Sequence, residues 1–383
     1  MRELNQRVVL ERLRSAGAAS RPRIAADTGL SKPTVGQALL GLERAGLVRT
    51  AGHAAGGQGR AAMLYEANPA AGHVLGIDIG RQRIRVAVAD LVGEVVARLD
   101  EDNRCQTASK LVRTVRACAD RAVADAGLRQ ADVVATVVGS PGVPDVRSAA
   151  LHRAPNLPGW ERKGLLNDLT TALGSGLVVE NDANLAAIGE HTTGAARGVG
   201  VAVYLLVGTG IGMGIVINGA LFRGAHGAAG EIGYLPFGWP SPEVPAQSRQ
   251  GMLESAVSAD AVMSNALAHG LAAVRTAKDV FDLARAGDAG AMRAVDEEAS
   301  RLAFAVSSVV AVVDPELVVL GGGIGSNADL LVEPMCRALA GCAPRVPDIV
   351  AGELGDEAVL AGAVATALGT AREAVLDRAG LTG

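Results

Sequence analysis

At 383 residues the chain is long enough for two or three domains, and its 49% hydrophobic residues supply ample buried core although only 2% are aromatic. The formal net charge of −4 is unevenly divided, because residues 1–68 contain ten Lys or Arg and five Asp or Glu, a net +5. A basic start on an acidic remainder indicates that only the start contacts a polyanion such as DNA. From charge alone, chance clustering on a solvated surface is an equally good interpretation.

Cysteine spacing and hydropathy argue against several other classes of protein. The four Cys form no CxxC pair and have no metal-ligand spacing. The N-terminus is charged and lacks the apolar stretch of a signal peptide, and apolar runs such as 199–207 are shorter than the ~20 residues of a membrane-spanning helix. We therefore expect a cytoplasmic protein with reduced thiols and no membrane contact.

Three short helices are predicted in residues 1–50. Gly17 ends the first, and Gly29 permits the left-handed turn that a helix-turn-helix needs between the second and the third. Ser20 and Ser31 cap the second and third helices, and Pro33 lies in a first turn, where its missing N–H costs nothing. The apolar residues expected on the buried faces are Val8, Val9, Leu10, Leu13, Ile24, Ala25, Val35, Leu39 and Leu42.

The third helix is predicted to bind DNA. Thr34, Gln37, Ala38 and Gly41 share a face that is short or polar throughout, which suits a major groove about 12 Å wide. Gln37 is expected to reach base edges, with Thr34 and Lys32 positioned for bases or phosphates. The residues of this helix predicted at the DNA interface are Ser31, Lys32, Thr34 and Gln37.

A strand at 47–50, a glycine-rich tip at 52–60 and a returning strand at 62–66 are typical of a wing, whose Arg60 can reach a minor groove or phosphates. The runs at 29–35 (GLSKPTV) and 42–48 (LERAGLV) closely resemble the winged-helix heads of bacterial repressors. A three-helix bundle without DNA contacts explains the turn chemistry alone, so DNA binding is the stronger hypothesis. A connector at 68–72 is too short to let head and body move freely.

From residue 73 onward strands alternate with helices. Glycine turns follow three strands, at 78–80 (DIG), 208–210 (GTG) and 321–323 (GGG), and Asn181 and Asp182 directly follow another. Glycine is needed in such turns because a Cβ blocks close approach of backbone N–H groups to phosphate. This order is typical of an actin-like ATPase fold. Strands are predicted at 74–80, 84–89, 133–138, 178–180, 201–207, 211–217 and 317–320, and a helix at 110–126.

These motifs closely resemble the ROK family of repressors and sugar kinases. The similar runs are 141–143 (PGV), 156–160 (NLPGW), 179–190 (VENDANLAAIGE), 208–214 (GTGIGMG) with 218–219 (NG), and 230–233 (GEIG). The resemblance implies an α/β fold: a two-lobed, actin-like domain preceded by a winged helix-turn-helix, as in the repressor branch. The implied boundaries are 1–70 for the head, 73–182 for the first lobe, completed by a C-terminal helix at 366–383, and 183–365 for the second lobe.

The resemblance also implies a carbohydrate site. Asn181 and Asp182 would hydrogen-bond sugar hydroxyls, and Asp182 is the general base in kinase members. A carboxylate accepts hydrogen bonds from two hydroxyl groups, and a site built on such bonds rejects ligands that lack them. A helix N-cap is a compatible second role for Asn181 and Asp182. The full set implied in sugar contact is Gly142, Asn156, Asn181, Asp182, Glu231, Tyr234 and Glu254.

Two departures from the family change the expected chemistry. Kinase members have Gly-Thr after the first turn, whereas Gly80 is followed by Arg81 and Gln82, so we expect a vestigial nucleotide site and no kinase activity. Members with a structural zinc have a His where this chain has Tyr234, and closely spaced Cys, of which residues 241–252 contain none. We therefore expect no metal. The vestigial nucleotide residues are Asp78, Gly80, Gly208, Thr209, Gly210 and Gly322.

The leading hypothesis is a sugar-responsive regulator, of repressor type, that binds a double-stranded operator as a homodimer or homotetramer. Its effector would be a small carbohydrate or sugar phosphate, and no cofactor is expected. The first alternative is an active ATP-dependent sugar kinase with a DNA-binding head, in which Asp182 is catalytic. The second is a constitutive DNA-binding protein whose large domain only dimerises.

Overall fold

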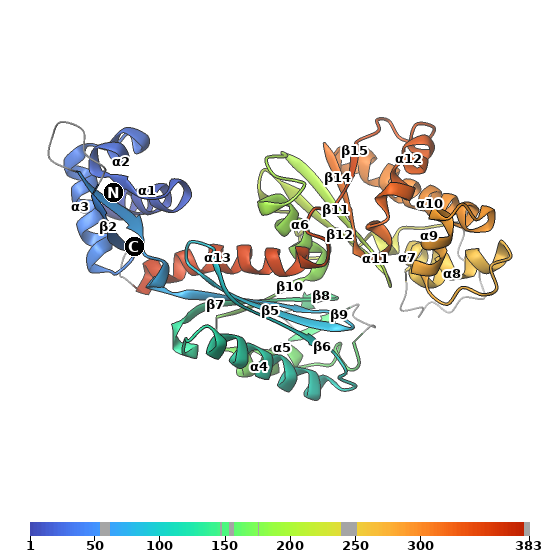
Figure 1. Ribbon diagram of the computed structural model, residues 1–383, viewed down its shortest axis with the longest axis horizontal. Helices are drawn as coiled ribbons and strands as arrows, with labels where there is room; N and C mark the ends of the chain where they lie inside the picture. The colour runs from blue at the N-terminus through green and yellow to red at the C-terminus, as the bar shows by residue number, and fades with distance from the viewer. Residues whose placement is uncertain (54–61, 146–147, 153–156, 175, 239–250, 379–383) are drawn as a thin grey trace.

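The computed structural model describes residues 1–53, 62–145, 148–152, 157–174, 176–238 and 251–378. An N-terminal head, a first lobe and a second lobe follow one another along an elongated molecule (Figure 1). In the part of the chain so described, no helix is long and apolar enough to cross a membrane.

The head packs three helices against a small antiparallel sheet. Its apolar core includes Val9, Leu13, Ile24 and Leu39, all completely or almost completely buried. Gly29 ends the second helix in the left-handed conformation (φ 72°), and the Ser31 side chain accepts a hydrogen bond from the Thr34 N–H. The predicted turn and the Ser31 cap are therefore present, whereas Ser20 lies at the N-cap position of the second helix but its side chain accepts no capping hydrogen bond. The elements are α1 (Arg2–Ala16), β1 (Ala19–Ser20), α2 (Arg21–Thr28), α3 (Lys32–Arg44), β2 (Val48–His53) and β3 (Met63–Ala67), with strand order β1-β3-β2.

One prediction about α3 is wrong. Ala38 is buried in the core of the head, and a Cβ on Gly41 would meet the side chain of Gln6 on α1, so both residues face α1 instead of solvent. The exposed face is rotated toward Gln37 and Leu40. Gln6 on the packed face of α1 is completely buried and lies against Gly41, and hydropathy does not predict the burial of this polar residue.

The first lobe is a five-stranded mixed sheet with strand order β10-β7-β4-β5-β6. Helices α4 and α5 cover one face and helix α13 covers the other (Figure 1). The edge strand β6 was not predicted. The elements are β4 (His73–Ile79), β5 (Arg83–Asp90), β6 (Val95–Asp102), α4 (Ala108–Asp125), β7 (Val133–Ser140), β8 (Val143–Asp145), β9 (Ala150–His152), α5 (Leu165–Leu173) and β10 (Leu177–Asn181), with short 3-10 turns at Pro69–Ala71 and Gln130–Asp132.

The second lobe has another five-stranded sheet, with strand order β13-β12-β11-β14-β15, and a helical layer built around the long helix α10. Its elements are α6 (Asp182–Thr193), β11 (Val201–Val207), β12 (Ile211–Ile217), β13 (Ala220–Leu221), α7 (Met252–Val257), α8 (Ala259–Ala268), α9 (Ala277–Arg285), α10 (Ala289–Val313), β14 (Leu317–Gly321), α11 (Gly322–Gly325), α12 (Ala328–Leu339) and β15 (Asp348–Ala351), with 3-10 turns at Ile232–Tyr234 and Gly355–Glu357.

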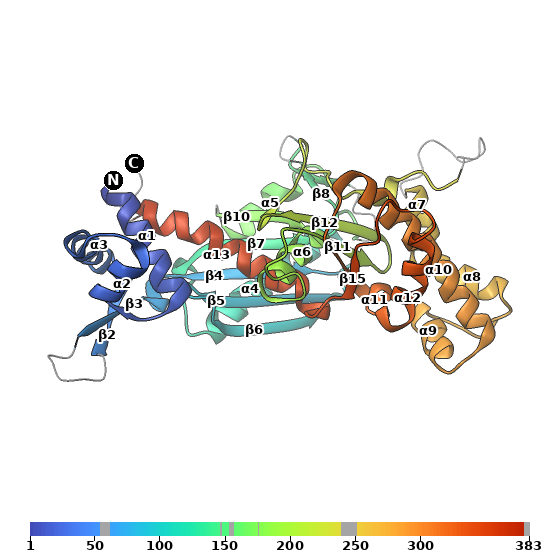
Figure 2. The ribbon, with the colours of Figure 1, turned by 90° about the horizontal axis from the view of Figure 1, so that it is seen from above.

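The C-terminal helix α13 (Ala358–Arg378) connects all three parts of the molecule. It begins beside the second lobe, crosses the first sheet over β4 and β7, and ends at the head (Figure 2). Its Val375 belongs to the apolar core of the head. The helix that completes the first lobe thus begins at Ala358 and not at residue 366, because a single unbroken helix runs from Ala358 through the predicted starting point.

Candidate functional site

A cavity of about 250 Å³ lies between the strand ends of the two five-stranded sheets. The first lobe contributes residues that follow β4, β7 and β10, and the second contributes the β11–β12 turn, the start of α11 and the segment around α7. The described residues lining it are Gly80, Arg81, Pro141, Gly142, Asn181, Asp182, Leu206, Gly208, Thr209, Gly210, Ile211, Gly212, Glu231, Gly233, Tyr234, Glu254, Gly322 and Gly323.

The structure brings most of the residues implicated by sequence to this one cavity. Six of the residues implied in sugar contact line it, although they come from segments spread over more than a hundred positions: Gly142, Asn181, Asp182, Glu231, Tyr234 and Glu254. All the vestigial nucleotide residues except Asp78 line it as well. Asn156 lies outside the described residues.

Asn181 and Asp182 are held where β10 becomes α6. The Asn181 side chain caps α6 by accepting a hydrogen bond from the Asn184 N–H, and its amide donates to the Gly142 carbonyl at 3.3 Å. The Asp182 carboxylate accepts from the Ala183 N–H at 2.9 Å. Capping thus orients both side chains at the cavity, and the N-cap and ligand-contact interpretations of Asn181 are compatible.

Three carboxylates, of Asp182, Glu231 and Glu254, lie close enough in the cavity wall to affect one another. Burial raises the pKa of Asp182 to about 6, with a smaller contribution from the negative charge of Glu231, while the hydrogen bond from the Ala183 N–H opposes the shift. Burial also raises the pKa of Glu254, again with a contribution from Glu231. Glu254 lies against the β11–β12 turn, since a Cβ on Gly210 would come within 2.1 Å of its Oε1 atom. Such a group of oxygen acceptors suits a ligand with several hydroxyl donors.

Glycine turns and one arginine form another part of the wall. Gly208 and Gly210 flank Thr209 in the β11–β12 turn, and Gly322 has φ 79°, a conformation that favours glycine. A Cβ on Gly322 would come within 2.5 Å of the Val207 carbonyl oxygen, so the two turns are in backbone contact. Arg81 is exposed and lines the cavity directly after Gly80.

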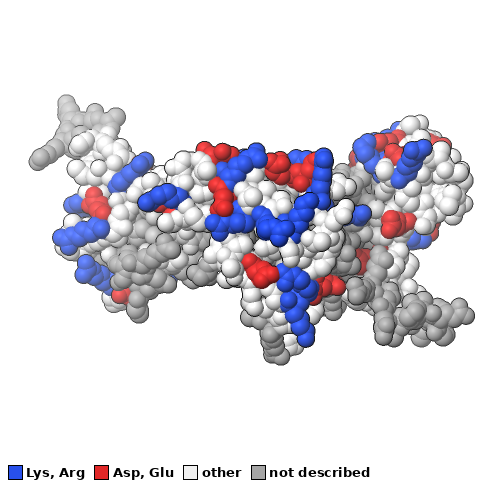
Figure 3. Space-filling view, turned by 90° about the horizontal axis from the view of Figure 1, so that it is seen from below, with Lys and Arg blue, Asp and Glu red and all other residues white. Residues whose placement is uncertain are grey.

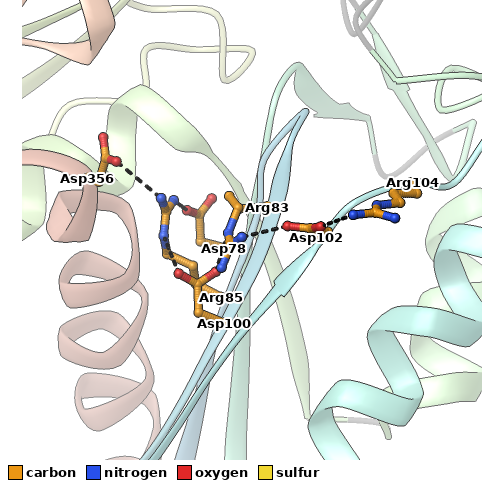
Figure 4. Close-up of polar contacts among 7 residues, drawn as sticks. All are labelled: Asp78, Arg83, Arg85, Asp100, Asp102, Arg104 and Asp356. Carbon is orange, nitrogen blue, oxygen red and sulfur yellow. Dashed lines mark hydrogen bonds and ion pairs between the residues drawn. The ribbon is translucent and has the colours of Figure 1, made fainter.

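Asp78 does not line the cavity but is buried within a charged network (Figure 4). Its carboxylate accepts from Arg85 Nη1 at 3.2 Å, and Arg85 also pairs with Asp356, just before α13. Burial raises the pKa of Asp78 to about 7, while Arg85 opposes the shift. Asp100 lies between Arg85 and Arg83 and links this network to the edge strand β6. That Arg85 is the partner of Asp78 was not predicted from the sequence.

A second ion pair that was not predicted supports the loop carrying Glu231. Glu180, buried at the end of β10, accepts from Arg223 Nε at 2.7 Å and from Asn184 Nδ2 at 2.9 Å. Arg223 follows β13 and begins the loop that leads to Glu231. The only sign of this ion pair in the sequence was Glu180 itself, an acidic residue in an apolar strand directly before Asn181.

Helices α6 and α13 connect the cavity to the head. Their backbones touch, because a Cβ on Gly362 would lie 1.8 Å from the Leu185 carbonyl oxygen and one on Gly189 would lie 2.3 Å from that of Ala358. At the end of α6, the buried Glu190 accepts hydrogen bonds from the backbone N–H groups of Glu353 and Leu354. The helix that begins at Asp182 is therefore fastened to the helix that ends in the head.

On the head, Lys32 and Gln37 are exposed on α3, and Thr34 is partly exposed beside them. The Thr34 and Ser31 hydroxyl oxygens are 2.8 Å apart, so Ser31 both caps the helix and faces solvent. Several Lys and Arg but few acidic side chains are visible on the head in Figure 3. Arg60 and residues 54–60 of the predicted wing tip lie outside the described residues, whereas residues 52 and 53 continue β2.

Residues 74–370 match the ROK family, and the chain therefore belongs to it. It is 32% identical over 290 residues to a glucokinase of Halalkalibacterium halodurans, covering 72% of this chain and 87% of that protein. It is 27% identical over 350 residues to a putative xylose repressor of Caldicellulosiruptor sp. strain Rt8B.4, covering 88% of this chain and 87% of that protein.

Two solved structures extend the comparison. A ROK hexokinase from Thermus thermophilus has 31% sequence identity and a TM-score of 0.65, covering 79% of this chain and 99% of its own. A ROK family transcriptional regulator described as a homologue of the E. coli MLC protein has 21% identity and a TM-score of 0.80. It covers 100% of this chain and 99% of its own, so the fold of the whole chain, head included, resembles that of a regulator.

Proposed function

We propose that this protein is a sugar-responsive transcription regulator of repressor type, in which a winged helix-turn-helix binds an operator and the cavity between the lobes binds a carbohydrate. The observation that carries the proposal is the physical connection between the two sites. Asp182 begins α6 in the cavity, α6 packs backbone to backbone on α13, and Val375 of α13 lies in the core of the head.

The carbohydrate would bind beside the three carboxylates of the cavity wall. Asp182, Glu231 and Glu254 supply hydroxyl acceptors, and the Asn181 amide is fixed by Gly142. Tyr234 adds a phenol at the rim, where it is 42% exposed. A sugar hydroxyl missing at any of these acceptors leaves a buried polar group unpaired, and this is the basis of selectivity.

DNA would bind at the head. Gln37 is exposed on α3 and would contact base edges, whereas Lys32 and Thr34 would contact bases or phosphates. We propose a homodimer or homotetramer, so that two heads read the half-sites of a two-fold symmetric operator. A sugar changes operator affinity only if it binds more tightly to one of the two arrangements of the heads.

We propose that this protein has no cofactor, and two features of its residues support the loss of ATP binding. The Arg81 side chain occupies the position of a small residue in the first phosphate turn, and a guanidinium already pairs with Asp78. The chain also lacks the family's zinc-binding residues, because Tyr234 stands in place of a histidine and residues 241–252 contain no Cys.

The experiment uses the full-length protein and an operator selected from a random duplex library. Fluorescence anisotropy measures operator affinity with and without each sugar of a panel, in wild type and in Asp182→Ala. We expect one sugar to change wild-type affinity at least fivefold and to leave the variant unchanged. If the selection yields no preferred duplex, or every sugar leaves operator affinity unchanged, the proposal fails.

A sugar kinase carrying a DNA-binding head is the second candidate, and one observation favours it. The raised pKa of Asp182, about 6, suits a general base that takes a proton from a sugar hydroxyl near neutral pH. An ADP-release assay over the same sugar panel separates the two functions. Turnover that is abolished by Asp182→Asn would establish the kinase.

A further inference from the structure

We propose that helix α1 is part of the DNA interface, and that the backbone of one operator strand lies in a groove between α1 and α3 with its phosphates on Arg2 and Asn5. The inference rests on the proposed function and deepens it, because it adds residues outside the helix-turn-helix and the wing to the site that binds the duplex. The groove has a volume of about 380 Å³, and its described lining residues are Arg2, Asn5, Pro33, Thr34, Gln37 and Ala38.

The groove is continuous with the face of α3 that is proposed to read DNA. Thr34 and Gln37 line one wall of it, so a duplex whose bases meet Gln37 passes along α1 as well. Arg2 and Asn5 line the other wall, three positions apart and therefore on one face of α1. A recognition helix in the major groove brings neighbouring elements against the flanking phosphates. The geometry thus places α1 beside the sugar-phosphate backbone and not beside the bases.

The Arg2 guanidinium lies over α3. A Cβ on Gly41 would be 3.9 Å from Arg2 Nη2, and Gly41 is one helical turn beyond Gln37. Because residues four positions apart share a helix face, the guanidinium is on the same side of α3 as Gln37. Arg2 is exposed there, and no ion pair or side-chain hydrogen bond joins it to another described residue. Its charge is therefore available to a phosphate that lies in the groove.

Several other arginines of the head are neutralised within the head itself. Their ion pairs are Arg12–Asp27, Arg23–Asp27, Arg14–Glu11 and Arg49–Glu66. Arg2 and Lys32 have no such partner in the described ranges, although they stand at the first positions of the two helices that form the groove. Uncompensated cations beside a reading helix are the electrostatic footprint of a polyanion, and they select a DNA backbone as the occupant of the groove.

The position of Arg2 also argues against a role in the stability of α1. Arg2 is the first residue of this helix, where the helix dipole favours an acid such as the adjacent Glu3 and disfavours a cation. The fold therefore gains nothing from the charge of Arg2, whereas a bound phosphate would compensate it. Asn5 adds an uncharged donor, because its amide has two hydrogens that can bind phosphate oxygens.

Anisotropy titrations of the full-length protein test the inference with the selected operator and a scrambled duplex of equal length, at about 50 to 200 mM salt. Arg2→Gln removes the charge and keeps a long polar side chain. We expect it to weaken binding to both duplexes by the same factor, about threefold or more, and to lower the slope of log affinity against log salt by about 1. Arg2→Lys should keep the wild-type slope.

The matched control is Arg7→Gln, which removes the same charge from the same helix. Arg7 is exposed and has no ion pair among the described residues, but it does not line the groove, so its loss should leave slope and affinity unchanged. Asn5→Asp gives a second, independent test. It puts a carboxylate into the groove near a helix N-terminus, which accepts an acid, so we expect an unchanged melting temperature and weaker binding to every duplex.

The possible results separate this inference from the proposed function. Equal slopes for Arg2→Gln and Arg7→Gln overturn the inference, as does a loss for Arg2→Gln on the selected operator alone, which would indicate a base contact. A changed oligomeric state in sedimentation, with DNA affinity unchanged, would identify a second copy of the chain as the occupant and overturn it too. In each of these cases the proposed function stands. If wild type selects no duplex, the proposed function itself fails.

Discussion

The contact between α6 and α13 predicts opposite effects for two glycine-to-alanine substitutions on the same helix. A Cβ at position 362 would lie 1.8 Å from the Leu185 carbonyl oxygen and 2.5 Å from its carbon, both backbone atoms that cannot rotate away. A Cβ at position 369 meets nothing within 4 Å. Gly362→Ala therefore forces the two helices apart, whereas Gly369→Ala only improves helix propensity.

The magnitudes follow from these distances. Real Cβ contacts are not shorter than 3.0 Å, so Gly362→Ala requires a separation of α6 and α13 by more than 1 Å. Overpacking of this kind costs about 1–3 kcal/mol, and a rigid backbone neighbour places the cost at the upper end. Alanine returns about 1 kcal/mol of helix propensity. We expect a net loss of about 2 kcal/mol for Gly362→Ala and a gain of about 0.5–1 kcal/mol for Gly369→Ala.

Urea unfolding of the full-length variants, followed by circular dichroism, measures the order of stability. The expected order is Gly369→Ala above wild type and wild type above Gly362→Ala. Operator-binding assays on the same variants should show a weakened sugar response only for Gly362→Ala. If Gly362→Ala is as stable as Gly369→Ala, the two helices do not touch as described, and the proposed connection between cavity and head loses its physical basis.

Three further predictions concern the cavity, the head and the junction. Burial raises the folded-state pKa of Asp182 to about 6 from 3.8, so its carboxylate costs stability above pH 6 and nothing below about pH 4. Asp182→Asn should therefore stabilise the protein by about 1–3 kcal/mol at pH 8. A gain in melting temperature of equal size at pH 4 would contradict this reasoning. In anisotropy titrations at several salt concentrations, Gln37→Ala should lose about 1–3 kcal/mol of binding free energy on the operator only. Lys32→Ala should weaken binding to every duplex and lower the slope of log affinity against log salt by about 1. Equal losses on operator and random DNA for Gln37→Ala would exclude base contact. Val375→Ala removes buried methyl groups from the core of the head and should lower the free energy of unfolding by about 1–3 kcal/mol. It should also reduce the effect of the sugar on operator binding, with sugar affinity in the absence of DNA unchanged. A full sugar response in that variant would exclude α13 as the connection.

Local chemistry was sufficient to predict much of the fold. Gly29 in its left-handed turn, Ser31 as a cap and the hairpin at 201–217 follow from turn and strand preferences of the residues themselves. The cavity-lining set was predicted through motifs shared with the family, because separate segments converge only in the folded chain. Composition and periodicity alone place none of these segments next to one another.

Features that depend on packing between distant segments were not predictable. The close approach of α6 and α13 depends on Gly189 and Gly362, two glycines on helices far apart in sequence. The pairing of Arg85 with Asp356 likewise joins positions that no local pattern relates. The edge strand β6 buries Leu99 and part of Ala97, but Val95 and Val96 are both exposed, so its sequence lacks the regular alternation that marks a strand.

The central claim is that occupancy of the cavity and operator binding at the head are coupled, and coupling must be reciprocal. The most direct measurement is the affinity of the effector sugar for the full-length protein, determined by calorimetry with and without saturating operator duplex. We predict that the operator weakens sugar binding by the same factor by which the sugar weakens operator binding. Equal sugar affinities in the two titrations would show that the two sites act independently.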